Sequence, residues 1–371
     1  MRTTLLVLLV LLVLFTASAG LGCAGNCRTE RAPENQPLGF MAQYAADVCR
    51  APFGGPGLAV TLTVEDGTLG LGASGEASSG SPLEPQGPFR LGTLSEVYTA
   101  ALVARLADQG RLDLAELVTE HLPWATTDEP VSLRQLLTHR SGIKDVSTLS
   151  GIDLASPQGP QALAQQALDR GLRFSPGERY GDSATDYLLL GLVVEEAMSQ
   201  DFGEALHQNV LDPNGLGATF VEGWDEMPAD LAAGHDGGGN ERGSLLAPEN
   251  AGGAFGIVSN GTDVERFVRL LFEEPDFLAE NTRLEFAFPA DGEAGDSGFG
   301  FGVRVDTLGG DEAWSRAGEH PTGYGAAFVY LPESEALSIA LTNARPSSPG
   351  RIAEFGAEYA AEFNPETASA E

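Results

Sequence analysis

Strand patterns occur near both ends of this chain, on either side of a long middle section with helical patterns. Near the N-terminus, apolar and polar residues alternate over 57–73 around a turn at 65–67, which predicts a β-hairpin. Strand patterns return at 300–305, 325–330 and 337–342, and amphipathic helices are predicted at 39–50 and 351–363. Residues from both ends therefore have to meet in one antiparallel sheet covered by the terminal helices, which is an α+β fold.

The middle section is predicted to form a mostly helical subdomain. Apolar residues fall three and four positions apart from Leu94 to Leu106, and Gly110 supplies a helix stop. No internal repeat or Pro/Ser-rich linker divides the chain. We expect a single domain over 39–363 with a helical insert at about 93–290, and then a short tail, 364–371. Further helices are predicted at 132–138, 161–170, 186–198, 201–210 and 263–272.

The charge balance excludes one broad class of partner. The chain has 21 Lys and Arg residues against 53 Asp and Glu residues, a net charge of −32. A phosphate-binding surface would have to form against this negative field, so nucleic acid is not an expected partner. The histidines show none of the spacings of zinc sites, and we expect neither a metal nor a cofactor.

The first 22 residues have the layout of a secretory signal. A short basic start precedes an apolar run from Leu5 to Phe15, and small residues follow up to Gly22. The run is too short for a comfortable membrane span, so a retained anchor is the lesser alternative. Cleavage is predicted either after Ala19 or before Cys23, and we favour the second, with lipid on the Cys23 thiol. The protein is then exported and held at the membrane by its lipid, with residues 23–38 as a tether.

Two further cysteines remain once Cys23 carries lipid. Cys27 and Cys49 form an even pair in an oxidising compartment, and a disulfide between them would tie the tether to the first helix. Two free thiols are the alternative, because sequence does not settle pairing geometry.

Several short motifs follow one another in a fixed order. They are FRLGTLSEVYTA at 89–100, GRLDL at 110–114, LLTHRSG at 136–142, FSPG at 174–177, DYLLLG at 186–191, LDP at 211–213, GFGF at 298–301 and ALTN at 340–343. In this order and spacing the chain resembles the serine β-lactamase and penicillin-binding family, close to its class C and D-alanyl-D-alanine carboxypeptidase branch. The resemblance runs from about Gly39 to Phe363, and it implies the β-lactamase/transpeptidase-like fold.

The resemblance also implies three catalytic motifs: Ser-x-x-Lys, Tyr-x-Asn and Lys/His-x-Gly. In the first, a lysine one helical turn after the serine can accept its proton. Here Thr93 stands at the serine position and Glu96 at the lysine position. An anion at Glu96 opposes the oxyanion that acyl transfer develops. Lys144, the only lysine in the chain, lies far along the sequence and is not expected to substitute.

The second motif falls on Asp182-Ser183-Ala184, so both its tyrosine and its asparagine are absent. Tyr180 is close by, but its position is interpreted as ordinary aromatic packing.

The third motif falls on Arg316-Ala317-Gly318, or one residue later on Ala317-Gly318-Glu319. Arg316 is interpreted mainly as a surface arginine. The alternative is a guanidinium that binds a carboxylate.

Two local interpretations accompany the altered motifs. Thr93 and Glu96 are predicted to form a capping box, with the threonine hydroxyl accepting the third amide and the glutamate reaching back. His139 is interpreted as a buried turn residue rather than a catalytic base.

Together these motifs predict an exported, non-catalytic relative of the serine hydrolases. It would bind a peptidoglycan-like peptide, a cell-wall fragment or a protein partner through Ser183, Arg316 and Gly318. The alternative is an active hydrolase of the β-lactamase, esterase or carboxypeptidase type that works through Thr93 or Ser95.

Overall fold

The structure, a computed structural model, describes residues 36–236, 239–241, 245–287 and 298–363. The predicted signal segment, the tail, and both Cys23 and Cys27 lie outside the described residues.

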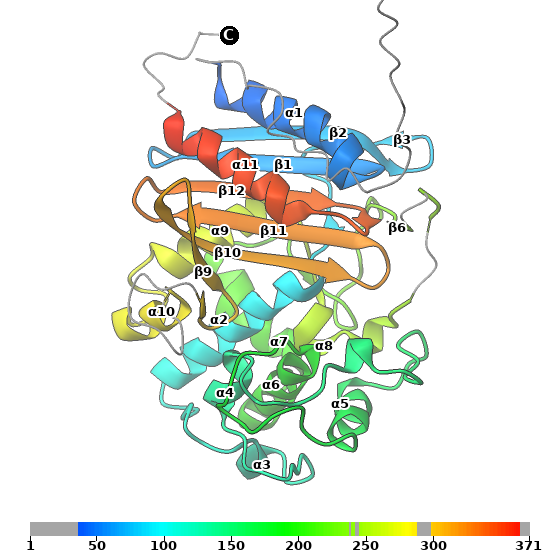
Figure 1. The fold of residues 1–371 in the computed structure, drawn as a ribbon, viewed down its shortest axis with the longest axis vertical. Helices are drawn as coiled ribbons and strands as arrows, with labels where there is room; N and C mark the ends of the chain where they lie inside the picture. The colour runs from blue at the N-terminus through cyan, green and yellow to red at the C-terminus, as the bar shows by residue number, and fades with distance from the viewer. Residues whose placement is uncertain (1–35, 237–238, 242–244, 288–297, 364–371) are drawn as a thin grey trace, which may run out of the picture.

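An eight-stranded antiparallel sheet joins the two ends of the chain (Figure 1). The hairpin of β1 (Gly57–Thr63) and β2 (Leu69–Ser78) pairs with the C-terminal strand β12 (Ala336–Thr342), with Leu58 opposite Thr342. The α+β prediction is therefore confirmed. The remaining strands are β3 (Ser81–Pro82) beyond β2, and β11 (Tyr324–Leu331), β10 (Asp311–His320), β9 (Arg304–Leu308) and β8 (Gly298–Phe299) beyond β12.

Two terminal helices cover one face of this sheet. α1 (Leu38–Cys49) packs on β2 and β1, and α11 (Pro349–Glu362) packs on β12 and β11 (Figure 1). The other face carries the insert, where α9 (Gly261–Phe272) packs on β1 and β12. Because both faces are covered, β1, β11 and β12 are buried along their whole length.

The insert is built around α2 (Ser95–Asp108) and α6 (Ala184–Met198), whose contact with α8 (Gly252–Phe255) lies deep in the larger hydrophobic core. A three-stranded sheet, β4 (Phe89–Arg90), β7 (Ile257–Ser259) and β5 (Phe220–Val221), lies beside them. The other helices of the insert are α3 (Val118–His121), α4 (Leu133–Leu137), α5 (Pro160–Leu168), α7 (Phe202–Leu206) and α10 (Glu280–Ala287). A last short pair joins β6 (His235–Asp236) to β13 (Ala344–Arg345).

The predicted strand at 300–305 is wrong. The chain bends there, with Gly300 N donating to Val303 O and Gly302 at φ 71°, so β8 ends before the bend and β9 begins after it. Sequence analysis also missed β10 entirely. Its residues facing the insert include an aromatic, a charged and a small residue, namely Trp314, Arg316 and Gly318, so no apolar alternation marks it.

No helix in the described ranges is long and apolar enough to span a bilayer. Cys49 is disulfide-bonded, and its predicted partner Cys27 falls outside those ranges, so the pairing of the two stays a prediction.

The close packing of α1 on β2 gives the first testable prediction. A Cβ on Gly72 would overlap the backbone of Ala42 and Gln43, so Gly72→Ala should destabilise the protein by about 1–3 kcal/mol. Exposed Gly217 has open space around its Cα, and Gly217→Ala should change stability by less than about 0.5 kcal/mol. Urea denaturation measures both, and equal effects would contradict this packing.

Candidate functional site

The altered motifs meet where β10 passes the start of α2. A 3₁₀ turn, Gly92–Leu94, leads into α2 and carries Thr93. A Cβ on Gly318 would lie only 2.8 Å from Thr93 Oγ1 and 2.9 Å from its carbonyl carbon. Glycine is therefore required for this close approach of Gly318 to Thr93.

Glu96 has no exposed surface, and its carboxylate faces β10. Its Oε2 pairs with the Arg316 guanidinium and lies 3.3 Å from His139 Nε2, while Oε1 is buried without a partner among the described residues. The predicted capping box is wrong for this reason. The residue before α2 is Leu94 and makes no side-chain cap, and the Ser95 hydroxyl accepts instead from Ile257 N at 3.0 Å.

Arg316 is not a surface arginine, because only 6% of its side chain is exposed. Besides Glu96, it donates to Asp182 Oδ1 through two nitrogens at 3.4 and 3.5 Å. Its guanidinium lies 5.1 Å over the ring of Phe299. The alternative prediction, that the Arg316 guanidinium binds a ligand's carboxylate, stays a prediction, and the carboxylates that it contacts here are those of Glu96 and Asp182.

His139 follows α4 in a left-handed conformation, φ 51°, and is fully buried, as its interpretation as a turn residue requires. Its Nδ1 lies 3.2 Å from Asp186 Oδ2, and its Nε2 lies 3.2 Å from Asp182 Oδ1. Asp186 is held in turn by the Ser141 hydroxyl, which donates to Oδ1 at 2.5 Å. A chain of polar contacts therefore runs from Ser141 through His139 to Arg316.

The electrostatics of this cluster follow from its burial. Burial raises the pKa of Glu96, against the effect of Arg316 and His139, and raises the pKa of Asp186 to about 6. Burial opposes a charge on His139, but hydrogen bonds to Asp186 and Glu96 outweigh it and raise the His139 pKa to about 9. For Asp182, burial is outweighed by Arg316, which lowers the pKa of that carboxyl. The cations Arg316 and His139 thus hold the carboxyl groups of Glu96, Asp182 and Asp186 in place.

Tyr180 and Phe299 form the mouth of the cluster. The Tyr180 hydroxyl donates to Asp182 Oδ1 at 3.1 Å, and the two rings are 4.9 Å apart. Tyr180 therefore does more than the packing predicted for it, because its hydroxyl also binds Asp182. The residue is 41% exposed. Ser183 and Ala184 are buried at the start of α6, and the Ser183 hydroxyl has no partner among the described residues.

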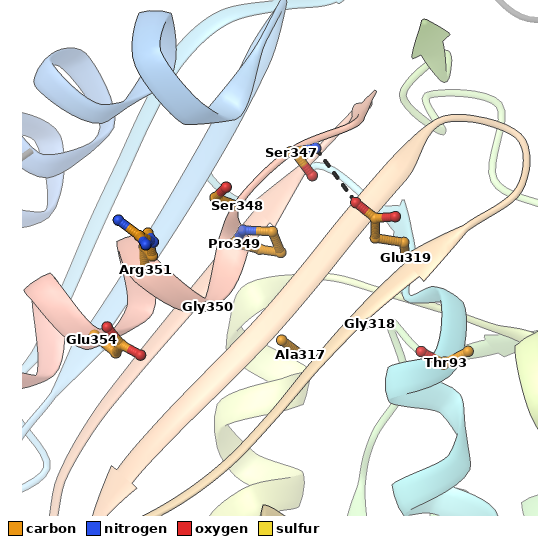
Figure 2. Close-up of a pocket in the computed structure, with 10 residues that line it drawn as sticks. All are labelled: Thr93, Ala317, Gly318, Glu319, Ser347, Ser348, Pro349, Gly350, Arg351 and Glu354. Atoms are coloured by element: carbon orange, nitrogen blue, oxygen red, sulfur yellow. Dashed lines mark hydrogen bonds between the residues drawn. The ribbon is translucent and has the colours of Figure 1, made fainter. Parts of the chain in front are cut away.

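A pocket of about 380 Å³ lies beside Gly318, between the turn that carries Thr93 and the first turn of α11 (Figure 2). Its lining residues are Thr93, Ala317, Gly318, Glu319, Ser347, Ser348, Pro349, Gly350, Arg351 and Glu354. Within the described ranges, no hydrogen bond joins the Thr93 hydroxyl to a carboxylate or an amine. Lys144 is engaged elsewhere, because its ammonium donates to the carbonyl of Arg170.

Sequence reasoning missed Asp186, Ser141 and Phe299. Asp186 carries a usable signal: it is an acidic residue directly before the apolar run Tyr187–Leu190, at a place that helix periodicity predicts to be buried. Phe299 lies in the GFGF motif at 298–301, but the motif does not show that β8 folds back beside β9 and brings this ring to Arg316.

The chain is similar to known proteins over most of its length. The family described as Beta-lactamase matches residues 47–361. Penicillin-binding protein 4 of Amycolatopsis lactamdurans is 29% identical over 250 residues, which cover 62% of this chain and 63% of that protein. Teichoic acid D-alanine hydrolase of Staphylococcus aureus is 26% identical over 147 residues, 39% of this chain and 34% of that protein. The chain thus spans less than two thirds of the length of these curated relatives.

Solved structures agree on the fold. A D-stereospecific amidohydrolase from Streptomyces sp. aligns with a TM-score of 0.74 at 22% identity, over 88% of this chain and 98% of that one. The predicted β-lactamase/transpeptidase-like fold is confirmed.

The buried pair predicts the effect of restoring the family's lysine. Glu96→Lys places a second cation against Arg316, and we expect a loss of at least about 3–5 kcal/mol in unfolding free energy. Glu96→Gln should cost less, because it removes a charge without adding an opposing one. Glu354→Lys, on the exposed face of α11, serves as the control and should stay within about 0.5 kcal/mol of wild type. A Glu96→Lys variant as stable as wild type would refute the pairing.

The raised pKa of His139 predicts a pH dependence. The His139 imidazole binds its proton more tightly in the folded state than in the unfolded state. Its contribution to the free energy of unfolding is therefore complete below the unfolded pKa of about 6.5. This contribution is lost as the pH rises through the folded pKa of about 9. The urea midpoint should therefore fall between pH 7 and 9.5. His139→Asn, which tolerates the left-handed backbone, should flatten that slope. An unchanged slope in this variant would show that other groups control it.

Proposed function

Because this chain belongs to the β-lactamase family, we propose that it descends from a serine hydrolase and binds its ligand without forming an acyl-enzyme. The single observation that carries the proposal is the fate of Glu96. At the position of the family's general base stands a carboxylate that is fully buried and paired with Arg316. A paired, buried anion of this kind has no means of activating Thr93.

The alternative nucleophiles do not improve the case for catalysis. Ser95 is fully buried, and its hydroxyl oxygen accepts from the backbone of Ile257. Thr93 reaches the pocket, but no hydrogen bond within the described ranges joins its hydroxyl to Glu319 or Glu354, the two carboxylates of the lining. Loss of the nucleophile or its base costs a serine protease of the Ser-His-Asp type about 10⁶ in rate.

Ligand binding does not need the lost groups. The pocket beside Gly318 keeps a hydroxyl from Thr93, the backbone edge of β10 and the first turn of α11. The relatives' names refer to penicillin, to D-alanine on teichoic acid and to D-stereospecific amides. We propose accordingly that this pocket takes a peptide or a cell-wall fragment with a D-amino acid end.

The proposed location is the cell envelope. Support comes from the signal layout of the first 22 residues and from Cys23 as an acceptor for lipid. The large negative charge is compatible with an exported, soluble domain at the end of a tether.

A labelling experiment tests the loss of acyl transfer. The mature protein is incubated with a fluorescent penicillin and denatured, and its intact mass is measured. We expect no adduct, whereas a serine penicillin-binding protein treated in parallel is labelled. Stoichiometric labelling of this chain would overturn the proposal.

A reconstructed variant and a binding assay sharpen this test. The reconstructed variant restores the three family motifs through five substitutions: Thr93→Ser, Glu96→Lys, Asp182→Tyr, Ala184→Asn and Arg316→His. Labelling of this variant shows that the cleft itself is intact.

The binding assay measures the melting temperature, which D-alanyl-D-alanine should raise for the wild type. Ala317→Trp fills the pocket and should abolish the shift, whereas Gly217→Ala should retain it. A shift that survives Ala317→Trp would place the ligand elsewhere.

A further inference from the structure

We infer that Glu96, His139 and Asp182 form a binding site for a divalent transition metal, with Zn²⁺ as the best fit. They come from α2, the turn after α4 and the turn before α6. Each offers one ligand atom, and the three atoms all lie within 4.8 Å of one another. The inference is independent of the proposed function, because it concerns the buried cluster and not the pocket.

The observed distances suit zinc. Zinc bonds to nitrogen and oxygen are about 2.0–2.2 Å, so two ligand atoms of a tetrahedral site lie about 3.3–3.5 Å apart. His139 Nε2 lies 3.3 Å from Glu96 Oε2 and 3.2 Å from Asp182 Oδ1. Two edges of the ligand triangle are thus already close to the required length. An imidazole nitrogen with two carboxylates is also a ligand set that zinc accepts.

The surroundings of His139 resemble those of a metal ligand. For Nε2 to bind a metal, Nδ1 has to carry the proton and donate it to an acceptor. Asp186 Oδ2 at 3.2 Å is that acceptor, and Ser141 fixes Asp186 through a second hydrogen bond. In this tautomer Nδ1 gives up the hydrogen bond that it otherwise accepts from Ser183 N at 3.3 Å. Carboxylates that orient a ligating histidine in this way are general in metal sites. A merely acidic surface patch has no such support.

Charge also favours a cation at this place. Glu96, Asp182 and Asp186 are three carboxylates, and Arg316 is the one permanently charged cation that contacts them among the described residues. With a neutral imidazole the group carries two excess negative charges, which a divalent ion neutralises. Burial makes such compensation valuable.

Arg316 is the group that a metal would have to displace from Glu96 Oε2. The other oxygen of that carboxylate, Oε1, is buried without a partner, and Arg316 Nε is buried in the same state. The guanidinium can therefore turn to Oε1 while the metal takes Oε2, and neither charge is left unpaired. These two unpartnered atoms are the second, independent sign that the cluster accommodates a further ligand.

Solvent reaches the site through Asp182. Its side chain is 52% exposed, next to partly exposed Tyr180, whereas Glu96 and His139 are fully buried. A metal held by three protein ligands would keep its fourth position on this open side, where water can bind.

A titration with Co²⁺ tests the inference. The full-length protein is first treated with a chelator, and excess Mg²⁺ is present to occupy weak acidic sites. Co²⁺ takes the place of zinc and absorbs visible light strongly when four-coordinate. We expect one saturable Co²⁺ per chain and loss of its absorption on addition of Zn²⁺. Non-saturating binding, or a six-coordinate spectrum, would overturn the inference.

Three variants locate the bound ion. Asp182→Asn alters a half-exposed ligand and should weaken Co²⁺ binding by about 10-fold or more. Arg316→Gln removes the competing cation and should strengthen it by a similar factor. Asp276→Asn, an exposed carboxylate away from the cluster, should leave it unchanged. If Arg316→Gln does not fold, Asp182→Asn alone decides, and unaltered affinity in that variant refutes the site.

Discussion

A buried ion pair between Arg316 and Glu96 joins the two halves of this molecule. The arginine belongs to the eight-stranded sheet, and the glutamate belongs to the first long helix of the insert. Both charges are buried away from solvent, so loss of one partner leaves the other uncompensated. Such a loss typically lowers the free energy of unfolding by about 3–5 kcal/mol. His139 and Asp182 extend the pair into a cluster beside the 3₁₀ turn Gly92–Leu94, against which β10 packs.

The same strand separates this cluster from the pocket. Successive side chains of a strand point to opposite faces, so Arg316 is directed into the insert while Ala317 and Glu319 border the pocket beside α11. Gly318 permits the close passage of the strand past Thr93. The altered groups Glu96 and Arg316 therefore lie on one face of β10, and the pocket for which we propose a ligand lies on the other.

The sequence was sufficient for the architecture but not for the contacts of the site. The runs of β1, β11 and β12 are mostly apolar because these strands are buried on both faces, whereas β10 carries Arg316 and Gly318 where apolar residues would mark it. Glu96 stands where the resemblance implies a lysine, and the local pattern predicts a cap that the structure does not contain. Its partner lies 220 positions away, and no local pattern reports a contact at that separation. Motif order pointed to Glu96, Asp182 and Arg316, but only the fold shows that they share one cluster.

A double-mutant cycle between Glu96 and Arg316 tests the central claim most directly. It compares the unfolding free energies of wild type, Glu96→Gln, Arg316→Gln and the double variant, so effects that the two sites do not share cancel. A pair that holds the insert to the sheet predicts a coupling energy of at least about 2 kcal/mol, with the double variant more stable than the sum of the single losses. A coupling near zero would mean that the two side chains do not depend on each other, and the account of the site would fail.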